Sequence, residues 1–589
     1  MRQANAASCW DDIHWSMWRI AQRSDLLSIV HSARQVAREV VAPQLAAGAR
    51  SSCEWTSEKA CILASLDEKG LTSILSSARQ GIATPLALAA WELAWVDGGA
   101  ATLCLSGSLA QMPIRDFGTK EQQERYIGNA ERMHGALCLT EPIPGAGTDA
   151  MFLSGRIDVA EWVPGSEPIL EIDKRGRFIS HMDFAEFVVV AVQGGGDSVR
   201  GGCLVILEPG DNGEFDRGLP VRKLGHRLAS TTSPVFRLRV PGSRIVGGYT
   251  IEDGVVVPNL DHRQLLGPAF RRTRAVLSLM TASKLLSVVE PVVSAPCHTG
   301  DESALCERMA DLWAAGEAAA SLGFSAARLS DEVDRWANPT DKLTKQADVV
   351  CPAAKLFSTN SAMDMLPRWA ALGGGGPMSS GPGGVYEKLM DAQVEAFYLG
   401  SEAVQRRLVS AAMIDGEFLR EFQAWMDEME RLALRLPWIG MRSLTAGLRL
   451  WYWTLLQLRQ QTDSLGAHLF CDARQGVTFP MADALCELLA ARSLALDVLE
   501  LEESSYPWAA TDSLLSVLSD VSSIASVRAA GSVGKTCTAL VLGYDGRFPV
   551  STAARSAFDE LRTKLFLSLT GTVTARDRVV RFLLRERAS

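Results

Sequence analysis

The chain has 589 residues, of which 47% are hydrophobic and 22% are charged, a balance typical of globular proteins. Its formal net charge of -9 disfavours a dominant nucleic-acid role, because nucleic-acid-binding proteins usually carry a basic field. At ~100–200 residues per domain, the length predicts three to five structural units.

The first residues and the cysteines indicate a cytoplasmic protein. Asp11 and Asp12 stand where a signal peptide would have its apolar core, so we expect no secretory signal. No stretch of about twenty residues is free of charge and apolar enough to predict a membrane span. The 12 cysteines show no CxxC spacing and the 8 histidines no HxH or HExxH, so we expect reduced thiols and no metal site.

The first 130 residues or so have the spacing of helices. In SDLLSIVHSARQVAREVVAPQLA, apolar residues recur every three or four positions, and Pro43 is expected to end the run. In GTKEQQERYI (118–127), Gly118 and Thr119 precede an acidic first turn, which predicts that a helix starts there.

The apolar period then changes to that of strands. EFVVVAV (186–192), CLVILE (203–208) and SPVFRLRV (233–240) are predicted strands, and the glycines of QGGGDSVRGG (193–202) predict a hairpin loop. In the third strand, apolar residues alternate with arginines, which predicts one buried and one solvated face: Phe236, Arg237, Leu238, Arg239 and Val240.

Helical spacing returns after Pro258. FRRTRAVLSLMTASKLLSVVEPVV (270–293) and ALCERMADLWAAGEAAASLGFSAARLSDEV (304–333) predict two long helices, and more follow from about 390 to the end. The order helical, β, helical predicts an α+β fold, with a ligand cleft where the β part meets the helices. The predicted domains are an N-terminal helical domain, a middle β domain, a C-terminal helical bundle and a helical extension, at residues 1–135, 136–248, 249–412 and 413–589.

Several segments resemble one known family. LCLTEPIPGAGTDA (137–150) resembles the flavin-contacting segment of acyl-CoA dehydrogenases, usually TEP–x–AG–S/T–D, with Pro144 as one extra residue. FGTKEQQERYI, GRFISHMDFAEFVVVAVQ, KLGHRLASTTSPVFRLRVP, AAKLFSTNSAM and YLGSEAVQR resemble further family segments in the same order, over roughly residues 30–410. The resemblance implies an acyl-CoA dehydrogenase-like fold with a β-barrel-like middle domain and the extra helical region of the larger members.

The resemblance also implies FAD and its contacts. Thr140 would supply a polar contact to the flavin ring, Phe178 stands where the family usually has a tryptophan wall, and Ser180 stands at the usual hydroxyl position. Small residues would let the backbone approach the ribityl chain and phosphates. The implied cofactor residues are Leu137, Leu139, Thr140, Gly147, Thr148, Phe178, Ser180, Gly373 and Gly374.

The catalytic base of the family is replaced. In acyl-CoA dehydrogenases a glutamate after the loop tyrosine removes the α-proton of an acyl thioester, and this chain has Leu399 there. Some members place the base on the long helix beside an arginine; Arg274 matches that arginine, but its neighbour is Thr273. Glu395 and Glu402 are the nearest carboxylates in sequence and remain the alternative bases.

The phosphate end of the implied cofactor site also departs from the family. The usual R–x–x–F–G turn aligns with Val292, Ala295 and Pro296, and Asp301 and Glu302 follow it. The RDA triplet has lost its arginine in KLMDAQ. Positive charge is therefore missing where the resemblance implies the FAD pyrophosphate, and Asp301 and Glu302 would repel it.

Two further motifs have ordinary interpretations. ASVRAAGSVGKT (525–536) matches a relaxed P-loop at Ala529, Gly534, Lys535 and Thr536, but it follows no strand, so we interpret it as coincidence. The tail TARDRVVRFLLRERAS (574–589) predicts a basic amphipathic helix, either docked on the protein or facing a partner or nucleic acid.

Three hypotheses remain open. The first is a flavoenzyme acting on an acyl thioester of CoA or of a carrier protein. The second is a non-catalytic scaffold or partner subunit, pairing with an active homologue that supplies the missing groups. The third is a helical nucleic-acid binder acting through the arginine tail. Because the family builds its cofactor site across a dimer interface, the resemblance also implies a homodimer or homotetramer.

Overall fold

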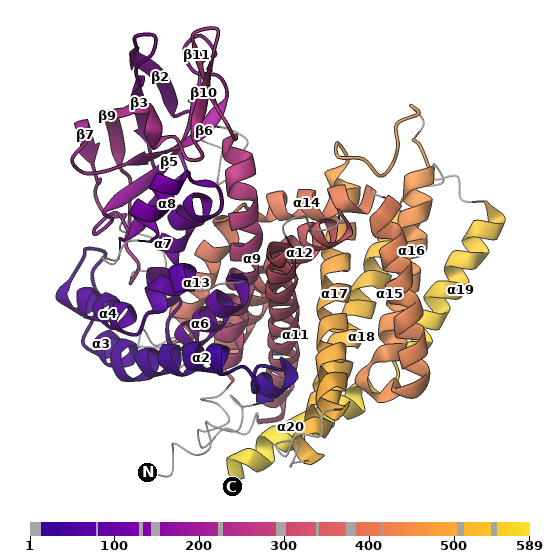
Figure 1. The fold of residues 1–589 in the computed structure, drawn as a ribbon. Helices are drawn as coiled ribbons and strands as arrows, with labels where there is room; N and C mark the ends of the chain where they lie inside the picture. Colours follow the sequence, from indigo (N-terminus) through magenta and orange to yellow (C-terminus); the bar gives the residue numbers. More distant parts are fainter. Residues whose placement is uncertain are drawn as a thin grey trace. The chain divides into compact units, whose positions relative to one another are not determined.

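The computed structural model divides the chain into two compact units (Figure 1). The mixed unit, with helices and strands, comprises Ile29–Met280 and Ser380–Ser401, and the helical unit comprises Met1–Ser28, Thr281–Ser379 and Glu402–Ser589. The residues that the structure describes are 13–77, 81–128, 133–142, 153–221, 228–289, 302–336, 341–372, 384–414, 416–463, 465–503, 512–543 and 551–588.

Helix α7 (Gly98–Phe117) connects the helical and sheet parts of the mixed unit, because it packs against both α6 (Ala83–Val96) and strand β1. A single residue, Asp97, separates α6 from α7, and its carboxylate caps α7 by accepting the N–H of Ala100 at 2.9 Å. The remaining helices before the sheet are α2 (Ser24–Val36), α3 (Ala42–Ala46), α4 (Ser57–Glu68), α5 (Ile74–Ser77) and α8 (Lys120–Tyr126), with a 3-10 turn at Leu71–Ser73.

Two local predictions for this region have different outcomes. The helix start at Thr119 is confirmed, because Thr119 and Gln122 form a reciprocal capping box at the start of α8. The expectation that Pro43 ends its helical run is wrong. A π-helical segment, Ala37–Val41, carries the chain directly into α3, with the N–H of Ala42 bonded to the carbonyl of Ala37, and the helix continues past Pro43.

The mixed unit holds a seven-stranded sheet of order β1-β5-β2-β3-β9-β7, with β6 on the other edge of β5. β5 pairs parallel with β1 and β2, and the other pairs are antiparallel. The three predicted strands are confirmed as β5, β6 and β9, and Phe236, Leu238 and Val240 are buried as the alternation predicted. The strands are β1 (Gly135–Cys138), β2 (Arg156–Glu161), β3 (Ile169–Arg175), β5 (Phe187–Gly194), β6 (Gly202–Leu207), β7 (Asn212–Asp216) and β9 (Val235–Pro241).

Two smaller strand pairs complete this part. β4 (Ile179–Ser180) pairs with β8 (Thr231–Thr232), and β10 (Tyr249–Glu252) pairs with β11 (Val255–Pro258). The β10–β11 hairpin lies beyond residue 248, where the C-terminal helical bundle was predicted to begin, and the next helix starts only at His262. The hairpin escaped the sequence analysis because its strands have four residues each and little burial. The four-domain division itself stays a prediction.

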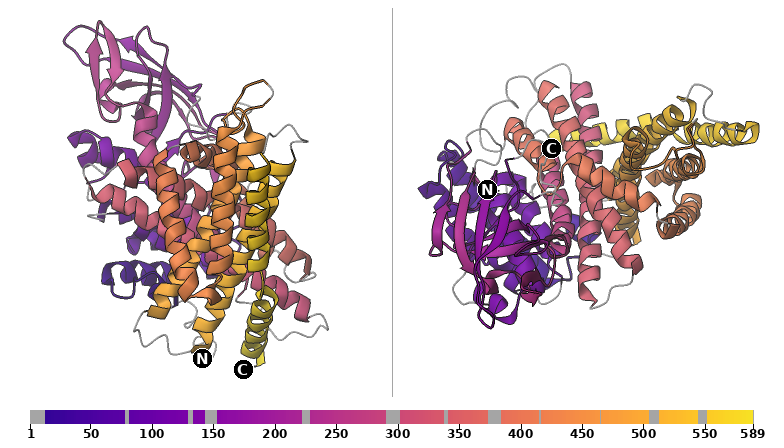
Figure 2. Two further views of the ribbon diagram at one scale, coloured as in Figure 1. Left: turned by 90° about the vertical axis from the view of Figure 1, so that its right-hand side faces the viewer. Right: turned by 90° about the horizontal axis from the view of Figure 1, so that it is seen from above.

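The helices after the sheet belong to both units. Helix α9 (His262–Ser287) continues from the mixed into the helical unit, and α13 (Val385–Phe397) returns to the mixed unit. In the helical unit, α17 and α18 lie side by side, and α11 packs against both (Figures 1 and 2). Its helices are α11 (Glu302–Arg335), α12 (Asp341–Leu372), α14 (Glu402–Ile414), α15 (Gly416–Arg435), α16 (Met441–Gln460), α17 (Gln475–Glu503), α18 (Asp512–Leu542), α19 (Thr552–Ser568) and α20 (Thr572–Ala588), with a 3-10 turn at Pro437–Ile439.

The two sequence motifs of the extension behave as ordinary helix. The P-loop-like residues lie inside α18, so no phosphate-binding loop forms there. In α20, Arg576 pairs with Asp311 at 2.7 Å and Arg578 pairs with Asp520, while Val579 and Leu583 are buried. The tail helix therefore docks within the helical unit. Among the helices that the structure describes, none is long and apolar enough to cross a membrane.

Candidate functional site

A cavity of about 460 Å³ lies within the mixed unit. We call its two sides the β wall and the helical wall. The β wall consists of Leu137, Leu139, Thr140, Phe178, Ile179, Ser180, Ala229 and Thr231, and the helical wall of Thr102, Ser106, Leu109, Phe270, Met390, Gln393, Val394, Phe397, Tyr398 and Leu399.

The β wall brings together five of the predicted cofactor residues: Leu137, Leu139, Thr140, Phe178 and Ser180. It also contains Thr231, which the sequence analysis missed and which the β4–β8 pairing places directly opposite Ser180. The other four predicted cofactor residues, Gly147, Thr148, Gly373 and Gly374, lie outside the described residues, as do Val292, Ala295 and Pro296.

Backbone contacts hold the two predicted flavin segments against each other. The N–H of Arg177 donates to the carbonyl of Thr140 at 2.9 Å. Gly176 allows this approach, because a Cβ atom there would lie 2.6 Å from the sulfur of Cys138. Phe178 then adopts a φ of 59°, a rare left-handed conformation for a bulky residue, and the Arg177 guanidinium lies 4.4 Å from its ring centre.

A buried ion pair supports the β wall from behind. Lys174 on β3 donates to the carboxylate of Glu141 and, at 3.3 Å, to the carbonyl of Leu139. The backbone N–H groups of Ser154 and Gly155 also donate to Glu141, at 2.6 and 2.8 Å. Burial alone would raise the pKa of Glu141, but Lys174 and these N–H groups outweigh it and lower the pKa. The charged glutamate therefore anchors the strand end that carries Thr140.

His181 joins the β wall to α7. Its Nε2 lies 2.9 Å from the carbonyl oxygen of Leu103, and its backbone φ is 70°. Burial lowers the pKa of His181 to about 4, with His134 nearby acting in the same direction. The imidazole is thus neutral at physiological pH and has a structural contact rather than a position in the cavity.

Neutral polar groups of two helices line the helical wall. Thr102, Ser106 and Leu109 follow one face of α7 at helical spacing, and the Thr102 hydroxyl donates to the Gly98 carbonyl at 3.0 Å. From α13 and the loop after it come Gln393 and Tyr398 among others. Burial raises the pKa of Tyr398, and a hydrogen bond with Thr102 offsets this only in part. Tyr398 therefore stays protonated.

Leu399 occupies the expected position of the base, and its side chain lines the cavity. It is only 6% exposed and has a φ of 60°, followed by Gly400 at 92°. Glu395 is buried on α13 but is not part of the described cavity wall. Glu402 begins α14 in the helical unit, where its carboxylate lies 2.9 Å from Arg406. Among the described lining residues, none carries a carboxylate, an imidazole or a cation.

The Thr273–Arg274 pair on α9 and the metal-ligating side chains are the remaining features that the sequence analysis considered. Thr273 on α9 donates to the carbonyl of Ala269 at 2.6 Å, and Arg274 lies over the ring of Phe270. Within the described ranges, no three His, Cys, Asp or Glu side chains gather as a metal site would require.

Comparisons with known proteins agree on one family. The acyl-CoA dehydrogenase N-terminal domain matches residues 24–132, and the acyl-CoA dehydrogenase C-terminal domain matches residues 295–414. The short-chain specific acyl-CoA dehydrogenase of Bos taurus mitochondria is 24% identical over 316 residues, covering 53% of this chain and 71% of that protein. The short-chain specific acyl-CoA dehydrogenase of Megasphaera elsdenii is 33% identical over 165 residues, covering 27% and 41%.

A solved structure extends the likeness of fold to the whole chain. The acyl-CoA dehydrogenase of Bacillus anthracis in complex with FAD superposes with a TM-score of 0.76, covering 97% of this chain and 96% of that one at 16% identity. The helical extension is therefore part of a known fold rather than an unrelated addition. With both family domains matched and this fold in common, the chain belongs to the acyl-CoA dehydrogenase superfamily.

Proposed function

We propose that this protein is an FAD-dependent oxidoreductase that acts on an acyl thioester of CoA or of a carrier protein, without the usual glutamate base. The observation that carries the proposal is the cavity itself. Its β wall contains the described residues that resemble the family's flavin contacts, and its remaining wall consists of apolar and uncharged polar side chains.

The residues of the β wall fit a flavin ring. Thr140, Ser180 and Thr231 are partly buried and line the cavity, and no hydrogen bond from their hydroxyls to another described residue is found. Such uncharged donors on a strand scaffold suit the polar edge of a flavin, with Phe178 and the leucines against its apolar part. When bound, FAD would supply the redox chemistry, either as the acceptor of a hydride from the substrate or, once reduced by an external electron donor, in a reaction with oxygen.

The helical wall indicates what the substrate brings into the cavity. An uncharged acyl group would lie against Leu109, Val394 and Leu399, and Gln393 would face a neutral polar substituent. An acyl group that ends in a carboxylate would be excluded from this cavity, because its charge would be buried without a partner. Burying a neutral polar group without a hydrogen bond already costs roughly 2–7 kcal/mol, and burying an unpaired charge costs more.

Leu399 determines the kind of oxidation. A positioned general base typically contributes ~10²–10⁴-fold to proton removal. No described residue of the cavity wall can act as that base, since Tyr398 stays protonated and Leu399 is apolar. Ordinary α,β-desaturation should therefore be slow, and a specialised oxidation that removes no α-proton, such as one using reduced flavin and oxygen, suits this wall better.

The second candidate is a non-catalytic scaffold or partner subunit in the same cytoplasmic setting. Leu399 in place of the base is the observation that favours it. In that role the protein would form a homodimer or homotetramer, or would pair with a homologous active subunit. Restored activity on mixing with such a homologue would distinguish this function from the first.

The first experiment is a visible absorbance spectrum of the purified protein, before and after incubation with excess FAD and desalting. A retained flavin band supports the enzyme. No band under either condition contradicts it and favours the scaffold.

For a flavin-containing protein, Leu399→Glu should raise acyl thioester desaturation by ~10²-fold or more, while the matched Leu399→Gln variant, which has no base, should not. Equal activities of the two variants would contradict the assignment of position 399.

A further inference from the structure

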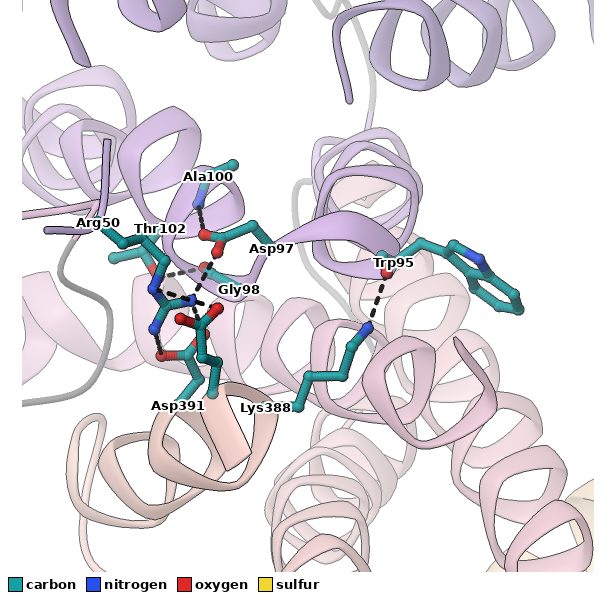
Figure 3. A network of polar contacts seen from close by, with 9 residues as sticks. Arg50, Trp95, Asp97, Gly98, Ala100, Thr102, Lys388 and Asp391 are labelled. Carbon is teal, nitrogen blue, oxygen red and sulfur yellow. Dashed lines mark hydrogen bonds and ion pairs between the residues drawn. The ribbon is translucent and has the colours of Figure 1, made fainter. Parts of the chain in front are cut away.

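A buried ion-pair cluster ties the α6–α7 junction to α13 (Figure 3). The Arg50 guanidinium donates to Asp97 at 2.6 Å and to both carboxylate oxygens of Asp391 at 2.8 and 3.1 Å. The exposed fractions of these side chains are 11% for Arg50, 2% for Asp97 and 1% for Asp391. Arg50 thus bridges two elements that are about 290 residues apart in sequence.

Lys388 makes a second tie at the same junction. Its ammonium group donates to the carbonyl of Trp95, in the last turn of α6, at 2.9 Å (Figure 3). Lys388 and Asp391 are three positions apart, so they lie on one face of α13. That face of α13 is held at two points: Lys388 binds the last turn of α6, and Asp391 is joined through Arg50 to Asp97, the residue between α6 and α7.

The charges of the cluster make Arg50 hard to replace. Glu387 lies 3.9 Å from the guanidinium, so three carboxylates surround one arginine. Burial alone would lower the pKa of Arg50, but Asp97 and Asp391 outweigh it and raise the pKa. A planar guanidinium can bind both carboxylates at once, whereas a lysine ammonium is a single point charge. Without the guanidinium, buried carboxylates would face one another.

Both elements joined by Arg50 line the cavity. Asp97 caps α7, which carries Thr102 and Ser106, and Asp391 stands between Met390 and Gln393 on α13. Resting on the proposed function, we propose that Arg50 is a positioning residue for the site. It fixes the spacing between the two helices of the helical wall, and with it the place of the Tyr398–Leu399 loop that follows α13.

The test uses the full-length protein and three variants. Arg50→Lys keeps the positive charge but loses the planar guanidinium that can bind two carboxylates at once. Asp391→Asn keeps the shape of the side chain but removes its negative charge. Arg34→Lys is the matched control, because Arg34 also donates two hydrogen bonds, both of 2.9 Å, to one buried carboxylate, that of Glu92, on α6. Hydrogen exchange over residues 385–400 is measured by mass spectrometry, FAD affinity by flavin fluorescence, and the affinity for an acyl-CoA by fluorescence titration.

We expect exchange over residues 385–400 to become about tenfold faster in Arg50→Lys and Asp391→Asn, but not in Arg34→Lys. The affinity for an acyl-CoA should fall by several-fold in the first two variants only, whereas FAD affinity, which depends on the β wall, should stay unchanged in all three. Exchange that matches the control in both variants overturns the proposal, and so does faster exchange with acyl-CoA affinity unchanged. If the wild-type protein binds no FAD, the proposed function fails, and exchange at 398–400 alone decides the role of Arg50.

Discussion

The two walls of the cavity are built in different ways. The β wall is placed by backbone pairing, since Ser180 and Thr231 are opposite each other in β4 and β8 and Thr140 is tied to Arg177 through main-chain atoms. The helical wall is placed by side chains, above all by Arg50 and Lys388. A wall set by side chains can exchange one lining residue without loss of the fold, and the proposed replacement of the base by Leu399 would be such an exchange.

The largest expected effect is a loss of stability when the ion pair that supports the β wall is removed. Lys174→Met would leave the Glu141 carboxylate buried without its cation and should lower the free energy of unfolding by about 3–5 kcal/mol. Arg237→Met is the control, because its pair with Glu214 is half exposed and should be worth at most ~1 kcal/mol. Denaturant unfolding of both variants measures the difference. Equal losses would contradict a supporting role for Lys174.

The next effect depends on pH. His181 has a folded pKa of about 4, below the ordinary value of 6.5, so the unfolded chain binds more protons between these values. Stability should therefore decrease as pH falls from about 6.5 to 4, by about 1–3 kcal/mol for this group. His181→Asn, which tolerates the positive φ, should flatten that decline in thermal unfolding. The exposed His468→Asn serves as control, and an equal decline in wild type and His181→Asn would refute the assignment.

A smaller effect should show that the two walls bind different ligands, FAD at the β wall and the acyl thioester at the helical wall. Thr140→Val and Ser180→Ala each remove one hydroxyl from the β wall and should weaken FAD binding about 2–10-fold. Thr102→Val removes a hydroxyl from the helical wall and should leave FAD affinity unchanged while weakening acyl thioester binding. Fluorescence titrations with FAD and with an acyl-CoA measure both. An equal loss of FAD affinity in all three variants would contradict the assignment of different ligands to the two walls.

The smallest expected effect concerns Glu402. Its carboxylate pairs with Arg406, which also pairs with Asp483, so it is engaged within the helical unit. Glu402→Gln should change stability by less than about 1 kcal/mol and leave any oxidation rate within twofold. Steady-state kinetics at several pH values provide the measurement. A loss of tenfold or more would restore Glu402 as an alternative base.

The fold was predictable from the sequence where the spacing of apolar residues reflects which side chains are buried. Phe236, Leu238 and Val240 alternate with arginines because β9 has one buried and one solvated face. Pro43 misled the prediction because a π-helical segment, which no residue pattern announces, accommodates it. The β10–β11 hairpin was missed because its strands are short and mostly exposed.

The site was predictable on the β wall and, within the helical wall, only at Tyr398 and Leu399. Thr140, Phe178 and Ser180 lie in segments that resemble a family motif, and the structure places them together. Thr102 and Gln393 gave no such signal, since nothing in the sequence relates α7 to α13 across nearly 300 residues. Arg50 is likewise an ordinary surface-type residue until the fold surrounds it with three carboxylates. Contacts of this range depend on topology, which spacing does not encode.

The division of the mixed unit into two chain segments has a consequence for synthesis. Ile29–Met280 emerges first, but Ser380–Ser401, which includes α13, follows only after the intervening helices. At about 5–20 residues per second, the ribosome needs about 6–24 s to add the 121 residues from Met280 to Ser401. Throughout that interval the nascent chain exposes apolar cavity residues such as Leu109 and Phe270 and keeps Arg50 without Asp391. The early segment is thus a candidate client for chaperones that bind exposed apolar surface during translation.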